Sequence, residues 1–278
     1  MVMAKASKLD GNGRTAPKRA VFVTSEKGGV GKSVAARALI DQLRTEGVRV
    51  AAYDADGGVG GLVRVLGTRD ADGNLIGKQD PVTGVDYYNV RAEAERPKLL
   101  NCLRTEERLI VHDLAGGSLV DLMEISDQGD GLRQLLRRFD LNGYRITVLH
   151  LISAEVGATQ SVARWIDLVG DRVDHVAVRN TRWGKSTGDF PFWHGFTDAR
   201  DVEKGGKVRR RLLEELGGHE ISLPAMPSGT FAKVDAENLA FSIAEEDPTL
   251  TIAEQSHVCK FREDFAAALE PIRPLLGL

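Results

Sequence analysis

The chain has 278 residues, of which 42% are hydrophobic, and this is enough to build a buried core in one large domain or two small ones. The formal charge of -3 excludes a globally basic nucleic-acid binder, although local basic patches stay open. The two cysteines, Cys102 and Cys259, lie far apart without metal-site spacing, which argues against a disulfide framework and a zinc site. No apolar stretch approaches the roughly 18 residues of a membrane span, and the N-terminus lacks the apolar centre of a signal peptide, so a cytoplasmic protein is expected.

Residues 1–19 are polar and carry five Lys and Arg against the single acidic residue Asp10. This composition predicts a flexible basic arm, to which the sequence assigns no role. Residues 20–278 are predicted to form a single domain.

The domain is predicted to begin with a strand at 20–24, followed by a Gly-rich loop. Apolar residues then recur at helical spacing until Gly47 ends the helix. A second apolar strand at 48–53 ends in Asp54-Ala55-Asp56. Further strands are predicted at 85–90, 109–112, 145–152 and 173–178, with a helix around 159–169.

Strands that alternate with helices predict a doubly wound α/β fold, with a mostly parallel sheet and helices on both faces. Ligands in such folds lie at the carboxyl ends of the strands. Three polar clusters are expected to meet there: the Gly-rich loop, the pair Asp54 and Asp56, and Asp113, which follows the strand at 109–112.

The Gly-rich loop, Ser25 to Ser33, reads SEKGGVGKS. Gly28, Gly29 and Gly31 allow backbone N–H groups to approach a polyphosphate, and the following helix N-terminus adds donors and a favourable dipole. Lys32 is expected to bridge the β- and γ-phosphates, while Ser33 and Asp113 hold Mg²⁺, partly through its water shell. This is the pattern of a P-loop NTPase that uses ATP and Mg²⁺.

A phosphate loop needs only one lysine, and Lys27 is an additional one. With this second lysine, the loop resembles the deviant Walker A motif of the ParA/MinD family of dimeric ATPases. The stretch YDADGG, starting at Tyr53, resembles the first switch of this family. The stretch LIVHDLAGG, starting at Leu109, resembles its Walker B strand and second switch. The resemblance extends from residue 20 to about residue 244.

The resemblance implies a role for each matching residue. Lys27 would reach across an ATP-sandwiched homodimer to the phosphates of the partner, Asp56 would orient the attacking water, and Asp54 would help to arrange magnesium and the switch. Plain strand-end carboxylates stay the alternative for both aspartates. The residues implied to hold the nucleotide are Gly28, Gly29, Val30, Gly31, Lys32, Ser33, Asn180 and Pro227.

Asn180 and Pro227 match the family positions that flank the purine. A side-chain amide can both donate to and accept from a purine edge. The alternative for Asn180 is that it is a simple turn residue. If the alignment to the family shifts, Pro224 replaces Pro227 as the matching proline.

The sequence departs from the family in three places. Glu26 stands where an ordinary Walker A motif has Gly, and the second switch lacks the proline common in the family. A long segment near 183–218 is rich in aromatic and basic residues and has no counterpart that the resemblance explains.

Two basic clusters leave nonspecific DNA binding open, because clustered cations on a helix can hold phosphates in a salt-sensitive manner. One comprises Lys207, Arg209, Arg210 and Arg211, and the other comprises Arg133, Arg137 and Arg138. A solvated helix face explains them equally well. Pro271 and Pro274 interrupt the apolar C-terminus, so membrane anchoring is not expected.

The expected function is an ATP-dependent dimerisation switch with slow Mg²⁺-dependent hydrolysis, stimulated by an activating partner protein. It would act in plasmid or chromosome partition, conjugative transfer or the positioning of a macromolecular cargo. The alternatives are a metabolic enzyme that uses ATP on a carboxylate or amide substrate and a nucleotide-gated adaptor with little hydrolysis.

Overall fold

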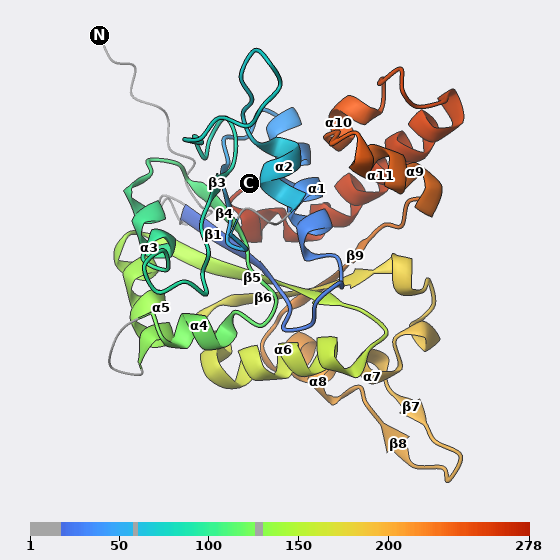
Figure 1. Cartoon of the computed structure of the whole chain (residues 1–278). Coiled ribbons are helices and arrows are strands. Elements are labelled where there is room, and N and C mark those ends of the chain that lie inside the picture. The colour runs from blue at the N-terminus through green and yellow to red at the C-terminus, as the bar shows by residue number, and fades with distance from the viewer. Residues whose placement is uncertain (1–17, 58–60, 126–129) are drawn as a thin grey trace.

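A seven-stranded parallel sheet forms the centre of the molecule, with the order β3-β2-β4-β1-β5-β6-β9 (Figure 1). This computed structural model describes residues 18–57, 61–125 and 130–278. The strands are β1 (Lys18–Thr24), β2 (Ala51–Asp54), β3 (Asp86–Tyr87), β4 (Leu109–Asp113), β5 (Tyr144–Ile152), β6 (Asp174–Asn180) and β9 (His219–Leu223). β2, β3 and β4 lie on one side of β1, whereas β5, β6 and β9, which follow in the chain, lie on the other side. This reversal of direction at β1 gives the doubly wound topology predicted from the sequence.

Helices cover both faces of the sheet, as predicted (Figure 1). One face packs against α1 (Lys32–Thr45), α2 (Gly61–Leu66), α9 (Ser228–Ala236), α10 (Phe241–Ala244) and α11 (Ile252–Leu269). The other face packs against α3 (Lys98–Asn101), α4 (Leu119–Met123), α5 (Gly131–Leu141), α6 (Val156–Val169), α7 (Pro191–His194) and α8 (Lys207–Arg210). β1 shows the underlying pattern, because Val21 and Val23 enter the first core while Ala20 and Phe22 enter the second.

The observed boundaries differ from the predicted ones at several points. Of the predicted arm 1–19, residues 1–17 lie outside the described residues, whereas Lys18 and Arg19 belong to β1. The strand predicted at 48–53 begins only at Ala51, because the N–H of Val48 still donates to the carbonyl of Leu43 and closes the end of α1. The strand predicted at 85–90 is regular only at Asp86–Tyr87.

The segment between β6 and β9 has its own packed base and a projecting arm. The arm is the hairpin of β7 (Phe196–Thr197) and β8 (Glu203–Lys204), which extends away from the body (Figure 1). At the base, Phe190, Trp193 and Leu212 are buried in a third cluster against α6. α8 continues into a π-helical turn at Arg211–Glu215.

Within the three described ranges, no helix combines the length and the apolar character needed to cross a membrane.

Candidate nucleotide-binding site

The three polar clusters predicted from the sequence lie together at the carboxyl ends of β1, β2 and β4. Parallel pairing sets Asp54 directly beside Asp113, and Val23, just before the loop, also pairs with Asp113. A cavity of about 490 Å³ opens there. Its lining includes Gly28, Gly29, Gly31, Lys32, Ser33, Asp56, Arg91, Asp113 and Gly116.

The loop takes its shape from glycines at two positions with left-handed backbone geometry. Gly29 has φ 74° and Gly31 has φ 101°. A Cβ at Gly31 would lie 2.4 Å from Nδ2 of Asn180. That nitrogen donates to the carbonyl of Val30 at 2.8 Å, so the end of β6 is hydrogen-bonded to the loop. α1 begins at Lys32, within the last residues of the motif, and directs its free N–H groups at the cavity.

Lys32 lies inside the cavity, between the loop and the acidic strand ends. Its ammonium donates to the carbonyl of Lys27 at 3.2 Å and lies 3.3 Å from where a Cβ on Gly116 would be. Burial lowers the pKa of Lys32, and the charge of Asp113 opposes that shift. The cavity thus holds a partly desolvated cation, which is suited to a phosphate group.

Asp113 and Asp54 are both buried. Burial, followed by the nearby charge of Asp54, raises the pKa of Asp113 to about 7, and the Ser33 hydroxyl opposes this by hydrogen bonding. Burial also raises the pKa of Asp54, which accepts the amides of Asp56 at 3.1 Å and Val63 at 3.4 Å. Oδ1 of Asp113 has no hydrogen-bond partner among the described residues.

This donor set suits Mg²⁺, although the described ranges contain no group of three His, Cys, Asp or Glu side chains placed to hold a metal ion. Mg²⁺ typically takes one or two protein oxygens and completes its shell with water and phosphate. The unpartnered carboxylate oxygen of Asp113 beside the hydroxyl of Ser33 provides such a pair.

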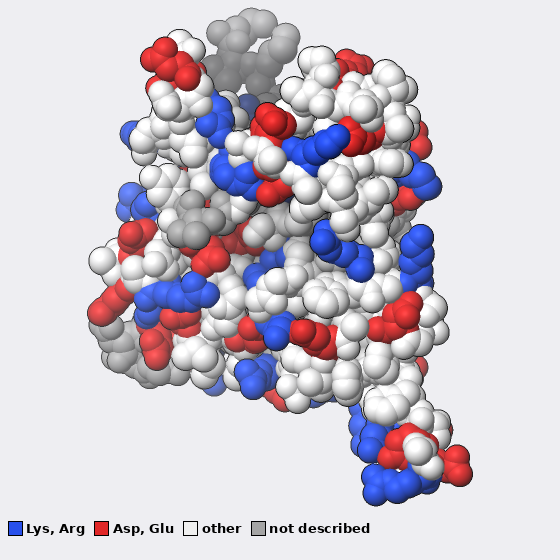
Figure 2. Space-filling view, turned by 45° about the vertical axis from the view of Figure 1, so that its right-hand side comes forward, with Lys and Arg blue, Asp and Glu red and all other residues white. Residues whose placement is uncertain are grey.

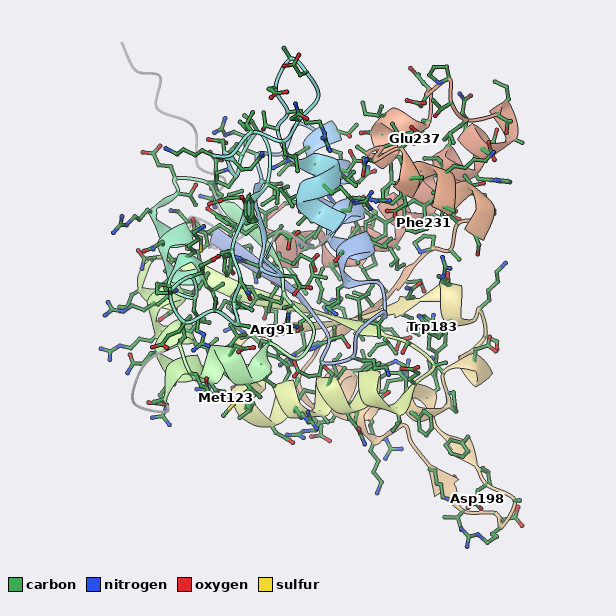
Figure 3. All side chains as sticks on the ribbon, in the orientation of Figure 1. Arg91, Met123, Trp183, Asp198, Phe231 and Glu237 are labelled. Carbon is green, nitrogen blue, oxygen red and sulfur yellow. The ribbon has the colours of Figure 1, made fainter. Side chains whose placement is uncertain are left out.

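Asp56 is half-exposed and is held by a residue that the sequence analysis missed. Nη1 of Arg91 lies 2.7 Å from Oδ1 of Asp56, and Nη2 of the same guanidinium donates to the carbonyl of Gly116 at 2.6 Å. Arg91 therefore joins the first switch-like segment to the second. Figure 3 labels this side chain near the centre of the molecule.

The side chain of Lys27 is half-exposed at the surface. Its ammonium lies 3.1 Å from Oε2 of Glu155, and the two side chains are 47% and 44% exposed. Glu155 directly precedes α6 and belongs to no motif found in the sequence. The extra lysine therefore has a partner in its own chain outside the phosphate cavity.

Glu26, the departure from the ordinary motif, is hydrogen-bonded to α6. Its N–H donates to the hydroxyl of Ser161 on α6 at 2.9 Å, and burial raises the pKa of its carboxyl. The residue thus anchors the loop to α6.

A second cavity, of about 560 Å³, adjoins the first and shares Gly29, Gly31 and Val34 with it. Asn180, Arg182, Pro224 and Phe231 also line it. Of the two candidate prolines, Pro224 lines the cavity, whereas Pro227 is the N-cap residue of α9 and is not among the lining residues.

Asn180 keeps hydrogen-bonding capacity in this second cavity. Its Nδ2 uses one N–H on Val30 and its Oδ1 accepts from the N–H of Arg182, which leaves a donor and an acceptor site. Across the cavity, the guanidinium of Arg182 lies 5.8 Å from the centroid of Phe231. Figure 3 shows Phe231 on the side of α9 and Trp183 below it.

Comparison with known proteins identifies the family. The family described as the CobQ/CobB/MinD/ParA nucleotide binding domain matches residues 21–245. No curated protein sequence matches the chain.

Three solved structures illustrate the similarity, and the first of them supports the fold. A ParA family ATPase from Chlorobium tepidum TLS is 13% identical, with a TM-score of 0.51 over 91% of this chain and 99% of that chain. The cell division ATPase MinD from Pyrococcus furiosus is 17% identical, with a TM-score of 0.49 over 90% of this chain and 99% of that chain. A putative plasmid partition protein from Borrelia burgdorferi B31, bound to AMPPNP, is 15% identical, with a TM-score of 0.41 over 90% of this chain and 98% of that chain. Because the family match spans most of the sequence and the topology agrees, the chain belongs to the CobQ/CobB/MinD/ParA family of nucleotide-binding proteins, as its motifs predicted.

Proposed function

We propose that the protein is an ATP-dependent dimerisation switch that hydrolyses ATP slowly. The observation that carries this proposal is the position of Lys27. Lys32 supplies the ammonium inside the phosphate cavity, whose lining also includes the guanidinium of Arg91, while the ammonium of Lys27 lies at the surface in a half-exposed ion pair with Glu155. An exposed pair of this kind is worth at most about 1 kcal/mol, so a phosphate group on a second chain can readily take Lys27 from Glu155.

The other residues of the site have separate roles in phosphoryl transfer. Lys32 and the N-terminus of α1 bind the β- and γ-phosphates, and Ser33 with Asp113 hold Mg²⁺, which neutralises phosphate charge when bound. Asp56, held by Arg91, orients the attacking water, and Asp54 fixes the backbone amides of Asp56 and Val63 by hydrogen bonds. Lys27 from the partner places its positive charge where negative charge develops on the phosphoryl oxygens during transfer.

The second cavity is the proposed site of the base. Asn180 offers the remaining N–H and lone pair to the purine edge, while Pro224 and Phe231 supply apolar surface. Pro227 then acts by starting α9 rather than by touching the base.

The cellular role proposed is partition or positioning of a macromolecular cargo in the cytoplasm, with an activating partner protein and nonspecific DNA as candidate ligands. The family and the two neighbours named for cell division and plasmid partition support this class of role. Figure 2 shows Lys and Arg interspersed with Asp and Glu on the face in view, so DNA binding would rest on local clusters such as α8.

The decisive experiment is the mass of the protein by light scattering with ATP and Mg²⁺, with ADP and Mg²⁺, and with ATP and EDTA. We expect a dimer only with ATP and Mg²⁺, and we expect Lys27→Ala to abolish it. Asp56→Ala should keep the dimer while turnover falls at least about 100-fold, because a water-orienting base contributes about that much. Lys260→Ala is the matched control, because this lysine is exposed on α11 and lines neither cavity, and the variant should behave like the unmodified protein.

Repeating the series with duplex DNA at two salt concentrations tests whether the protein acts in partition on DNA. Salt-sensitive association of the ATP dimer alone would support partition on DNA. A mass that does not depend on nucleotide, together with an unaffected Lys27→Ala variant, would contradict the switch and favour a metabolic ATP-using enzyme. A stable ATP dimer without any turnover would favour a nucleotide-gated adaptor.

A further inference from the structure

A third cavity lies near the amino ends of the strands, at the end of the sheet away from the nucleotide site. It has a volume of about 330 Å³ and is lined by α5, the first residues of β5 and Arg172, which follows α6. β5 begins here at Tyr144 and reaches the nucleotide edge only at Ile152. The two sites are therefore separated by the length of a nine-residue strand.

Among the described residues, four arginines and a single carboxylate, that of Asp140, line this cavity. Arg133 pairs with Asp130 at 3.3 Å, and Arg145 pairs with Asp174 at 3.0 Å. The other two arginines have no carboxylate partner in the described part of the chain.

The two uncompensated arginines stand on different elements. Arg137 projects from α5 and makes no hydrogen bond or ion pair with any described residue. Arg172 donates through Nε to the carbonyl of Val169 at 3.0 Å and through Nη2 to the carbonyl of Leu168, and this holds its guanidinium in place at the end of α6. A fixed guanidinium and a free one thus share one concave site, which favours an anion with several oxygens.

The floor of the cavity is apolar. Leu136 and Ile146 line it together with Tyr144, whose hydroxyl is already used because it donates to the carbonyl of Glu107 at 2.6 Å. A cavity near 300 Å³ with an apolar floor and a few convergent charges suits a small organic ligand.

We propose that this cavity, formed by Arg137, Arg172 and the apolar floor, binds a small phosphorylated organic molecule. The arginines take the phosphate and the floor takes the organic part. The site is independent of the nucleotide site and of the function proposed for it.

The test uses the full chain carrying Lys32→Ala, which weakens phosphate binding at the nucleotide loop, and phenyl phosphate as the probe. Calorimetric titration at about 150 mM salt suppresses diffuse charge effects. We expect one phenyl phosphate per chain, and we expect it to bind more tightly than inorganic phosphate because of the apolar floor. Adding Arg137→Ala or Arg172→Ala should weaken binding at least about tenfold, since each removes hydrogen bonds to a charged group.

Arg138→Ala is the matched control, because Arg138 is exposed on the same helix but does not line the cavity. We expect it to change the affinity less than twofold. The proposal is overturned if no binding occurs, if Arg137→Ala and Arg172→Ala leave the affinity unchanged, or if Arg138→Ala weakens binding as strongly as Arg137→Ala. Binding of duplex DNA without binding of phenyl phosphate would equally overturn it.

Discussion

Gly31 is the residue at which the phosphate loop and β6 come closest. Its φ of 101° is rarely adopted by other residues, and the space that a Cβ would take is already occupied by the side-chain amide of Asn180. Gly28, three residues earlier, has open space around a Cβ and an ordinary φ. The backbone geometry of the loop therefore requires glycine at Gly31 but not at Gly28, although both belong to the glycine-rich motif.

We expect Gly31→Ala to lower the free energy of unfolding by about 1–3 kcal/mol, because the residue must adopt a strained φ and displace Asn180 from Val30. Gly28→Ala should change it by less than about 1 kcal/mol. Urea unfolding followed by tryptophan fluorescence measures both variants. Equal stability of the two would contradict the close approach between the loop and Asn180.

At the scale of elements, the segment between β6 and β9 is a packed structure and not merely a long loop. Trp193 on α7 is completely buried, and its indole Nε1 donates to Oε2 of Glu220 at the start of β9, 3.1 Å away. The same carboxylate pairs with Arg179 on β6 at 2.8 Å and with Arg209 on α8 at 2.7 Å. One acidic residue thus joins four elements of the segment and the sheet edge.

Trp193→Ala should therefore lower the free energy of unfolding by about 3–5 kcal/mol, as expected for removal of a large buried side chain. Trp183 is the matched control, because it belongs to the same segment but is 40% exposed, and Trp183→Ala should cost less than about 1 kcal/mol. Urea unfolding followed by far-UV circular dichroism is the measurement, since both changes remove a fluorophore. Similar small losses for both variants would mean that the segment is not anchored as described.

For the whole molecule, the sequence was sufficient to predict the topology and the meeting of the polar clusters. Apolar runs that alternate with helical periodicity predict a parallel sheet, and in such a sheet every residue that ends a strand lies at the same edge. Asp54 and Asp113 accordingly pair across neighbouring strands, although they lie far apart in the sequence. The glycines and Lys32 were recognisable because phosphate binding requires backbone geometry that few residues supply.

The ion pairs around the site could not be predicted in the same way. Arg91 and Glu155 stand in irregular segments with no periodicity, and each finds its partner only through the tertiary fold. The choice between Pro224 and Pro227 depended on where β9 ends and α9 begins, and element boundaries are the weakest part of any prediction from propensity. The packing inside the segment between β6 and β9 rests on side chains such as Glu220 that carry no motif.

The core also contains a pair of histidines that makes the stability of the whole molecule depend on pH. His175 Nε2 donates to the carbonyl of Gly170 at 2.8 Å, so its Nδ1 accepts from Nε2 of His150, 2.9 Å away. Burial lowers the pKa of both residues, and for His150 the neighbouring His175 adds to the effect. Asp174 and Arg145 oppose each other near His175, and Trp165 packs against His150 edge-on.

We expect the free energy of unfolding to fall as the pH drops below about 6.5. Unfolded histidines take up protons near that pH, whereas the folded pair stays neutral until its depressed pKa values are reached, so the unfolded state binds more protons in this window. Each histidine contributes at most about 1.4 kcal/mol per pH unit. His150→Gln keeps a donor for His175 but removes one titrating group. In urea unfolding between pH 7.5 and pH 5.5, the difference between variant and unmodified protein should therefore shrink as the pH falls below about 6.5. A difference that stays constant across this range would show that the buried pair does not take part in acid destabilisation.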